Sequence, residues 1–423
     1  RWRTLCKDII KRIVWRKIMI NVAVLGYGTV GSGVYEVLVK NKESIAKRVG
    51  DEINVKYVLD LRDFPGDPVQ EVLVHDFDTI VNDPEVDIVA EAMGGLEPAY
   101  TFAKKTLESG KNYCTSNKEL VAKYGPELLE IAKANGKNFL FEASVGGGIP
   151  IIRPLNQSLT ADELTEITGI LNGTTNFILS KMAKEGSSFD AVLKEAQNLG
   201  YAERNPAADG EGYDACRKIA ILSSLAYGCH VDFEDIYTEG ITKITDIDFK
   251  YAKKLGLSIK LFGKSKKVDD KCYAMVAPFM INSDNPLYSV NGVLNGILVK
   301  GDVIGDVMFY GAGAGKLPTA SAVVADIVDE AKHLHTNIMT IWSNKKLALE
   351  NLSTLKNKFF VRFDGSVDSK MSEVTKAFGD VKVVTVDGLD NEFAIITEVM
   401  TEADFEAAAA KVDGVKSRIR VEA

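Results

Sequence analysis

The sequence predicts an α/β protein with a doubly wound parallel sheet, a second α+β domain and a small C-terminal βαββαβ domain. Strand and helix patterns alternate from Met19 to about Ile149, which is typical of a parallel sheet covered by helices. The character of the chain changes at Ile151, and a separate short alternation occupies its C-terminal part. The expected organisation is a first domain at 19–150 completed by 311–330, a second domain at 151–310, a helical linker at 331–356 and a C-terminal domain at 357–423.

Composition fits a globular protein of several domains. The 423 residues are 46% hydrophobic and 26% charged, with a formal net charge of −8. That charge argues against a nucleic-acid partner, and no apolar run approaches the roughly 18 residues that a membrane-spanning helix needs. The five cysteines lack C-x-x-C spacing, so we expect plain thiols in the reducing cytoplasm rather than a zinc site or disulfides.

Residues 1–18 differ from the rest, with seven basic residues and one acidic residue. We expect this basic leader to lie outside the fold, with Met19 as the native start. An amphipathic targeting or membrane-surface segment is the alternative, although the apolar region and cleavage site of a secretory signal are missing.

The first strand, at 21–25, runs directly into a glycine-rich turn and then a helical pattern. The turn is Gly26-Tyr27-Gly28-Thr29-Val30-Gly31. In this context G-x-G-x-x-G is the dinucleotide-binding fingerprint, which predicts NAD or NADP as cofactor. Gly26 would make the tight turn, Gly28 would let the backbone approach the pyrophosphate, and Gly31 would let helix and strand pack closely.

The second strand, at 53–59, ends in Asp60-Leu61-Arg62. A carboxylate there would bind the ribose hydroxyls of NAD, whereas an arginine would meet the 2′-phosphate of NADP. Asp60 and Arg62 are both candidates, so the choice of cofactor stays open.

Further strands are expected at 87–93, 112–115 and 139–143. Ligands of such sheets lie at the carboxyl ends of the strands. The residues at those ends, expected near the nicotinamide, are Met93, Gly94, Ser116 and Lys118. Taken alone, Lys118 could equally be an ordinary surface lysine.

Two later segments are rich in small or neutral polar residues. The first, at 168–179, includes Gly173 and Thr174 and could hydrogen-bond a small polar ligand or another subunit, although a turn into a helix also explains it. The second, at 311–319, is a glycine-rich loop containing Gly315 before a helix that we expect to return to the first domain.

The most informative stretch is 196–218, which gathers Glu203, Asp209, Asp214 and Lys218. Asp214 and Lys218 are four residues apart and share one face of an expected helix. A solvated ion pair is the simpler interpretation. The apolar run that follows favours a helix entering a core, where a lysine beside carboxylates can exchange a proton with a substrate.

With these residues laid out, the chain resembles the homoserine dehydrogenase family, whose enzymes interconvert L-homoserine and L-aspartate 4-semialdehyde with NAD(P). The likeness runs from about Met19 to Asp329. It rests on GYGTVG, TSNK, EASVGGGIP, GILNGTTNFIL, the stretch around GYAE and D-x-x-x-K, and GAGAGKLPTASAV. Gly210 departs from the family pattern, because an apolar residue is usual there; a glycine could loosen the loop that carries Asp209.

The resemblance implies roles for particular residues. It implies that Lys218 donates and accepts the proton of the substrate hydroxyl beside Asp214, with Lys118 as a second lysine of the site. It implies homoserine contacts from Glu203, Asp209 and Asp214, and cofactor contacts from Gly200 and Gly315.

The resemblance also implies an ion, an assembly and a pathway. A monovalent cation, usually sodium, would bind the backbone carbonyls of Glu142, Val145, Gly147 and Ile149. The enzyme would be a homodimer or homotetramer formed through the second domain, and it would act in the route to threonine, methionine and isoleucine.

The βαββαβ pattern at 357–423 resembles an ACT domain, a small regulatory module that binds amino acids. Its first turn, at 364–367, departs from the usual acidic-x-x-glycine form. An amino-acid effector, such as threonine, and a purely structural tail are both open.

Two other functions would also use a nicotinamide-cofactor fold. A phosphorylating semialdehyde dehydrogenase would need a cysteine nucleophile with a base beside it, and neither Cys114 nor Cys216 has that setting in the sequence. A non-catalytic, amino-acid-responsive binding protein could keep the cofactor fold, and formation of NAD(P)H from homoserine separates it from an enzyme.

Overall fold

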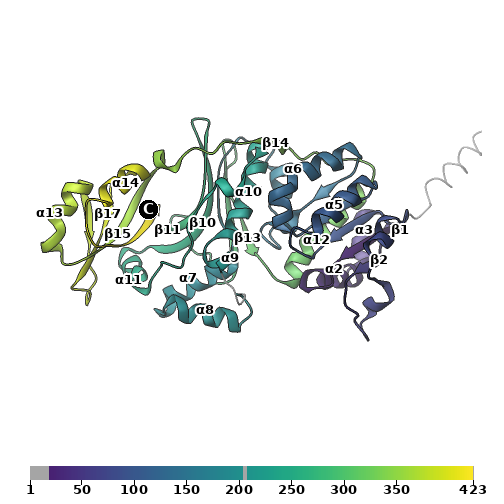
Figure 1. The fold of residues 1–423 in the computed structure, drawn as a ribbon, viewed down its shortest axis with the longest axis horizontal. Helices are drawn as coiled ribbons and strands as arrows, with labels where there is room; N and C mark the ends of the chain where they lie inside the picture. The colour runs from purple at the N-terminus through teal and green to yellow at the C-terminus, as the bar shows by residue number, and fades with distance from the viewer. Residues whose placement is uncertain (1–18, 203–206, 423) are drawn as a thin grey trace, which may run out of the picture. The chain divides into compact units, whose positions relative to one another are not determined.

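A computed structural model describes residues 19–202 and 207–422, which form two compact units (Figure 1). The first unit contains 19–148 and Gly315–Thr340, and the second contains Ile149–Ala314 with the C-terminal part from Ile341. The leader at 1–18 and Glu203 lie outside the described residues. The predicted return of the chain to its first domain is confirmed.

The first unit is built on a parallel sheet of six strands in the order β3-β2-β1-β4-β5-β6. The strands are β1 Met19–Leu25, β2 Glu52–Leu59, β3 Leu73–Val74, β4 Ile88–Glu91, β5 Asn112–Thr115 and β6 Phe139–Leu140. This is the strand order of dinucleotide-binding Rossmann folds. The predicted strands are present, although β4 and β6 are shorter than expected.

Helices cover both faces of this sheet. They are α2 Thr29–Lys40, α3 Lys42–Val49, α4 Phe77–Val81, α5 Ala99–Glu108, α6 Lys118–Ala134 and α12 Lys316–Lys332, with short 3-10 turns η1 Pro68–Val72 and η2 Glu142–Ser144. In Figure 1, α2 and α12 lie on one side of the sheet and α5 and α6 on the other. Gly33 lets α2 and α12 touch, because a Cβ atom there would lie 2.9 Å from the Ala320 side chain.

The second unit contains a mixed sheet of eleven strands, whose first part has the order β13-β12-β7-β10-β11. Its strands are β7 Leu164–Ile170, β9 Tyr237–Thr238, β10 Ser258–Val268, β11 Lys271–Ile281, β12 Leu294–Gly301 and β13 Gly305–Ala312. Its helices are α7 Gly173–Glu185, α8 Phe189–Asn198, α9 Ala207–Gly210, α10 Tyr213–Tyr227 and α11 Asp246–Leu255, with short turns η3 Pro154–Ser158 and η4 Phe233–Asp235. Gly263 of β10 admits α10, because a Cβ atom there would lie 3.2 Å from Ile219.

The C-terminal module, defined here as residues 356–422, continues the same sheet. It consists of β15 Lys356–Asp364, α13 Val367–Phe378, β16 Val381–Val384, β17 Glu392–Thr397, β18 Met400–Thr401, α14 Glu402–Ala409 and β19 Val415–Glu422. The βαββαβ order is as predicted, apart from the two-residue strand β18. Strand β19 lies between β11 and β15, parallel to β11 through Phe279–Ile281 and antiparallel to β15.

The prediction of a helical linker at 331–356 is wrong. Helix α12 ends at Lys332, and the segment that follows contains only the strand β14 Ser343–Lys346 and the turn η5 Leu352–Thr354. Strand β14 pairs with β8 Cys229–His230, and Trp342 is buried and stacks on His230. From Ile341 onward this segment is therefore an extended strap, residues 341–355, packed on the second unit.

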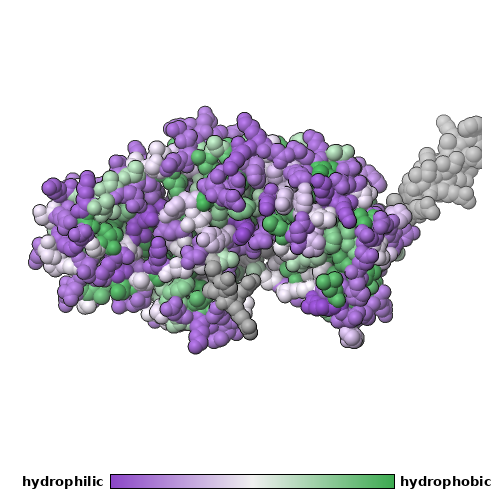
Figure 2. Space-filling view, viewed as in Figure 1, coloured by the Kyte–Doolittle hydropathy of each residue, from purple (hydrophilic) through white to green (hydrophobic). Residues whose placement is uncertain are grey.

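On the visible surface of each unit, hydrophilic residues predominate and hydrophobic residues form smaller patches among them (Figure 2). Across 19–202 and 207–422, no helix combines the length and apolar character needed to cross a membrane.

Candidate active site

The glycine-rich turn after β1 has the geometry predicted from its sequence. Gly26 has φ +92°, a left-handed conformation that favours glycine. A Cβ atom on Gly31 would lie 1.8 Å from the carbonyl oxygen of Gly26, so no larger residue fits there. A Cβ atom on Gly28 would meet no described atom within 4 Å. The backbone at Gly28 is therefore open to a ligand.

Helix α2 begins directly after this turn, at Thr29. Gly28 and Thr29 are exposed and Val30 is half-buried. No side chain of the described chain caps the helix, and its first turn holds no acidic residue. Uncapped N–H groups at a helix N-terminus bind phosphate well, so the turn fits a dinucleotide pyrophosphate.

Asp60 and Arg62, considered separately in the sequence, form a pair. The Asp60 carboxylate accepts hydrogen bonds from Arg62 Nε and Nη2, both at 2.9 Å, and from the Tyr27 backbone N–H at 2.9 Å. The Arg62 guanidinium holds the pKa of Asp60 well below its usual range. The Arg62 side chain is 63% exposed, against 10% for Asp60. The outer group of the pair is therefore a cation.

Glu91, at the end of β4, organises the loop that follows and was missed in the sequence. Its Oε1 accepts hydrogen bonds from the backbone N–H groups of Met93, at 2.5 Å, and Gly94, at 3.0 Å. Its Oε2 accepts from the Thr115 hydroxyl at 2.5 Å. Burial raises the pKa of this carboxyl. Ser116 N–H bonds the Glu91 carbonyl at 3.2 Å, so the candidate residues at these two strand ends are tied together.

Lys118 is the first residue of α6 and is half-buried. Asn117 caps this helix by accepting from the N–H groups of Glu119 and Leu120, each at 3.1 Å, and it donates to the Gly95 carbonyl. The cap fixes the backbone from which Lys118 projects, at the carboxyl end of β5.

The residues proposed to hold a cation are buried. Glu142, Val145 and Gly147 are buried in the first unit, and Ile149, which begins the second unit, is buried too. Gly147 has φ +55°. In the described chain no group of three His, Cys, Asp or Glu side chains is arranged to hold a metal, so a cation here would depend on carbonyl oxygens.

In the second unit, Lys218 and Asp214 form a buried pair on the first turns of α10. Their exposed fractions are 9% and 4%. Lys218 Nζ donates to Asp214 Oδ2 and to the Leu171 carbonyl, both at 2.8 Å. The alternative of a solvated ion pair is therefore wrong.

Asn172 joins the pair to a second carboxylate. Its Nδ2 donates to Asp209 Oδ1 at 2.8 Å and to Asp214 Oδ2 at 2.9 Å, and its Oδ1 accepts from Thr175 N–H, capping α7. Asn172 is itself buried. The sequence offered one signal, an asparagine at the start of a helix, but the separation of 37 and 42 residues from its partners hid this role.

The remaining candidates occupy varied positions. Gly173 has no room for a side chain, because a Cβ atom would lie 2.8 Å from the Val293 carbonyl oxygen. The Thr174 hydroxyl donates to the Tyr201 carbonyl at 2.6 Å. Gly200 is an exposed turn residue of the second unit, with φ +76°. Gly315, with φ +116°, precedes α12 in the first unit.

Two buried thiols lack the setting of a nucleophile. Burial raises the pKa of Cys114 well above its ordinary value and also raises that of Cys216. A reactive cysteine needs the opposite shift, because the thiolate is the nucleophile. The second unit instead presents a lysine held by a carboxylate, which is equipped to transfer a proton.

Comparisons with known proteins agree with this chemistry. Residues 150–328 match the family described as "Homoserine dehydrogenase", and residues 26–142 match "Homoserine dehydrogenase, NAD binding domain". The homoserine dehydrogenase of Bacillus subtilis is 38% identical over 95% of this chain and 98% of its own length.

Two solved structures are also similar. A homoserine dehydrogenase from Thiobacillus denitrificans has a TM-score of 0.88 at 38% identity, covering 96% of this chain and 98% of that chain. A hyperthermophilic archaeal homoserine dehydrogenase in complex with NADPH has a TM-score of 0.64 at 28% identity, covering 76% and 100%.

Proposed function

Because the chain belongs to the homoserine dehydrogenase family, and is therefore an NAD(P)-dependent oxidoreductase acting on a CH–OH group, we propose that Lys218 moves the proton of the substrate hydroxyl. The observation that carries the proposal is the buried contact of Lys218 with Asp214 at 2.8 Å. An alcohol gives up hydride only as its hydroxyl proton leaves, so a base must stand within hydrogen-bond reach. The bound dinucleotide accepts that hydride.

Each polar group of the cluster then has a task. Lys218 takes the hydroxyl proton during oxidation and returns it during reduction, while Asp214 and the Leu171 carbonyl hold the amine in position. Asp209 and Asp214 bind the amino-acid end of homoserine, whose ammonium they would pair. Asn172 keeps these two carboxylates at a fixed spacing. We also assign Glu203 and Lys118 to substrate binding, on the family resemblance.

The test replaces Lys218 by methionine, which keeps most of the side-chain length. We expect kcat for NAD(P)H formation from homoserine to fall by about 100-fold or more, the usual contribution of a general base. The Kd for NADPH should stay within about twofold, because the dinucleotide turn belongs to the other unit.

Lys260→Met is the matched control. Lys260 is also a buried lysine that donates to a carbonyl, that of Val290, but it lies outside the cluster. Near-normal kcat in Lys218→Met would reject the assignment, and so would an equal loss in both variants, which would point to general destabilisation.

For the cofactor, we propose that Arg62 meets the 2′-phosphate of NADP. Arg62 is the exposed member of its pair, and its contacts with Asp60 offset a carboxylate that would otherwise repel phosphate. Arg62→Ala should raise KM for NADPH by roughly tenfold, the effect of losing one charged contact of about 1.4 kcal/mol, and should leave KM for NADH nearly unchanged. Equal effects on both cofactors would refute this role.

We propose that a sodium ion binds the carbonyls of Glu142, Val145, Gly147 and Ile149. Carbonyl oxygens suit a hard cation, these four residues are buried, and left-handed Gly147 turns the chain sharply within the loop. Thermal unfolding in sodium chloride and in choline chloride at equal ionic strength tests it. A higher Tm in sodium is expected, and equal values would contradict the site.

We propose that the C-terminal module responds to an amino acid such as threonine. A cavity of about 250 Å³ lies where the module meets β10 and β11 of the mixed sheet in the same unit. Its lining includes Lys266, Lys358 and Glu422, charges of both signs that suit a zwitterion. Titrating threonine into the homoserine assay should change KM or kcat at millimolar concentration. No change with any aspartate-derived amino acid would leave the module a structural tail.

We propose that the chain assembles as a homodimer or a homotetramer through its second unit. The edge strand β13 and the turn before it expose Val303, Ile304 and Tyr310. Exposed edges are usually covered in native proteins. Light scattering after size exclusion should give at least twice the chain mass of 46.1 kDa, and a monomer would refute the assembly.

The state of the thiols is linked to the cellular location of the enzyme. The described cysteines are all free, as is usual for cysteines of proteins in a reducing compartment. We propose a cytoplasmic location. Alkylation of the half-buried Cys229 by a membrane-impermeant reagent, in intact and in lysed cells, would test it, since labelling in intact cells would contradict it.

A further inference from the structure

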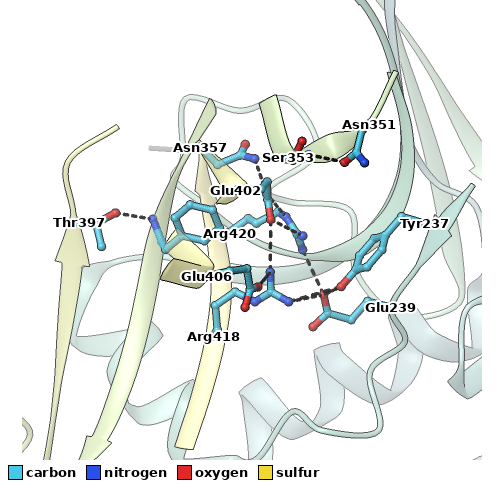
Figure 3. A network of polar contacts seen from close by, with 11 residues as sticks. Tyr237, Glu239, Asn351, Ser353, Asn357, Thr397, Glu402, Glu406, Arg418 and Arg420 are labelled. Carbon is cyan, nitrogen blue, oxygen red and sulfur yellow. Dashed lines mark hydrogen bonds and ion pairs between the residues drawn. The ribbon is translucent and has the colours of Figure 1, made fainter. Parts of the chain in front are cut away.

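Glu239 lies where the C-terminal module meets strand β9 of the same unit (Figure 3). Its Oε2 accepts hydrogen bonds from Arg418 Nη2 at 3.2 Å and from Arg420 Nη1 at 3.1 Å, both on β19. The Tyr237 hydroxyl donates to the same oxygen at 3.0 Å. One carboxylate therefore receives two cations of the module.

The module side of this contact is held in place. Arg420 is only 2% exposed and bonds Glu402 through Nε at 2.7 Å and Nη2 at 2.9 Å, a bidentate arrangement. Asn357 Nδ2 donates to the same carboxylate at 2.7 Å. Because Glu402 belongs to α14 and Asn357 to β15, the guanidinium that meets Glu239 is fixed by the module's own elements (Figure 3).

The other side of Glu239 leads directly to the segment before α10, residues 208–212, which contains the end of the one-turn helix α9 and is called the Asp209 loop here. The next residue, Gly240, is so close to this loop that a Cβ atom would lie 2.0 Å from the Gly210 carbonyl oxygen. Ile241 N–H donates to that same oxygen at 2.8 Å. The two backbones are in contact, so the segment that carries Glu239 cannot shift without moving Gly210.

Gly210 directly follows Asp209 and precedes α10, which carries Asp214 and Lys218. As a glycine, Gly210 has no side chain that could hold it in place. An alanine there would place its Cβ atom 3.4 Å from the Thr242 methyl group, an ordinary packing distance. Besides its hydrogen bond from Asn172, Asp209 therefore depends on the backbone contact with 240–241. That segment is held by the Glu239 side chain and by the Glu239 N–H, which donates to the Val276 carbonyl at 2.8 Å.

We propose that Glu239 is a positioning residue for the Asp209 loop, through which the C-terminal module sets the geometry of the substrate site. The inference deepens the proposed function, because it takes Asp209 as a substrate-binding residue. Glu239 touches no substrate; it acts by anchoring Gly240 and Ile241, on which the loop rests.

The test compares Glu239→Ala with Glu406→Ala. Glu406 also faces Arg418, at 3.9 Å, but it is exposed and lies on α14 away from the Asp209 loop. We expect Glu239→Ala to raise KM for homoserine by roughly fivefold to twentyfold, a usual range for coupling between sites, with kcat and KM for NADPH changed less than twofold. Hydrogen exchange should become faster in peptides covering 208–215. Glu406→Ala should show neither effect.

Two further variants sharpen the result. Gly210→Ala adds the contact with Thr242, so it should lower the raised KM when combined with Glu239→Ala; a merely structural role for Glu239 predicts no such rescue. If Glu239→Ala does not fold, Arg418→Gln removes one of the two cations and should give a smaller change of the same kind.

Unchanged exchange at 208–215, or faster exchange with a normal homoserine KM, would overturn the inference. Asp209→Asn is measured alongside. A normal homoserine KM in that variant would reject the substrate role of Asp209, whereas a raised KM there with no effect of Glu239→Ala would reject only the positioning role.

Discussion

Replacing Asn172 by aspartate or by serine isolates the role of its amide donor. Serine and aspartate both cap helices well, so the N-cap of α7 is preserved in each variant, and both lose the Nδ2 donor to Asp209 and Asp214. The variants differ in charge, because only aspartate places a third carboxylate beside the other two. The comparison therefore measures the cost of charge in this buried cluster.

The magnitude follows from the distances of 2.8 and 2.9 Å between Asn172 Nδ2 and the two carboxylates. At about 3 Å and an effective dielectric constant near 20, each like-charge pair costs about 5 kcal/mol. The new carboxyl therefore stays protonated in the folded protein. Keeping it protonated lowers the free energy of unfolding by about 1.4 kcal/mol for each pH unit above its reference pKa of about 3.9. The cost reaches at most about 6 kcal/mol at pH 8 and about 1.5 kcal/mol at pH 5.

The sign follows from this raised folded-state pKa: stability is retained below the unfolded pKa and lost as pH rises. Urea unfolding at pH 5 and pH 8, followed by the fluorescence of Trp342, buried in the same unit, measures both variants. Asn172→Asp should be the less stable at pH 8, with a gap from Asn172→Ser that shrinks by up to about 4 kcal/mol at pH 5. Equal stability at pH 8, or a gap independent of pH, would refute the reasoning.

Three other changes have clear expected outcomes. Burial and the nearby Asp326 raise the pKa of Glu330 well above 4.5, so the folded state keeps a proton that the unfolded state releases. The wild type therefore loses stability as pH rises, whereas Glu330→Gln does not, so the stability of the variant relative to the wild type should increase between pH 5 and pH 8. A difference in urea unfolding that stays constant over this range would contradict this. Gly31→Ala should prevent folding of the first unit or abolish NADPH binding, because its Cβ atom would overlap the Gly26 carbonyl, and a normal Tm with normal NADPH fluorescence would exclude the clash. Gly28→Ala should fold with an unchanged Tm but bind NADPH at least about tenfold more weakly, because the methyl group would stand where the pyrophosphate approaches; unchanged affinity would place the phosphates elsewhere.

Local patterns in the sequence predicted most of the first unit, although not the two-residue strand β3. Apolar runs bounded by glycine predicted its strands, and the spacing of Gly26, Gly28 and Gly31 predicted a turn that the structure confirms. These features depend on neighbouring residues, so a single sequence contains them.

Features that depend on distant partners were missed or left open. The strap at 341–355 was predicted as helix, but Ser343 and Lys346 pair with Cys229 and His230, and this tertiary contact overrides local preference. Asp60 and Arg62 were weighed as alternatives, whereas they bond to each other. The substrate roles of Asp209 and Lys218 stay predictions, although Asn172 and Asp214 bring them into one cluster.

The position of β19 has a consequence for how the chain matures. During synthesis β11 emerges long before β19, so the edge of β11 at Phe279–Ile281 lacks its partner strand until β19 leaves the ribosome. An open edge of this kind can pair with other nascent chains. We therefore expect chains shortened before Val415 to aggregate in the cell, and we expect chaperones that shield extended segments to assist biogenesis of the full-length enzyme.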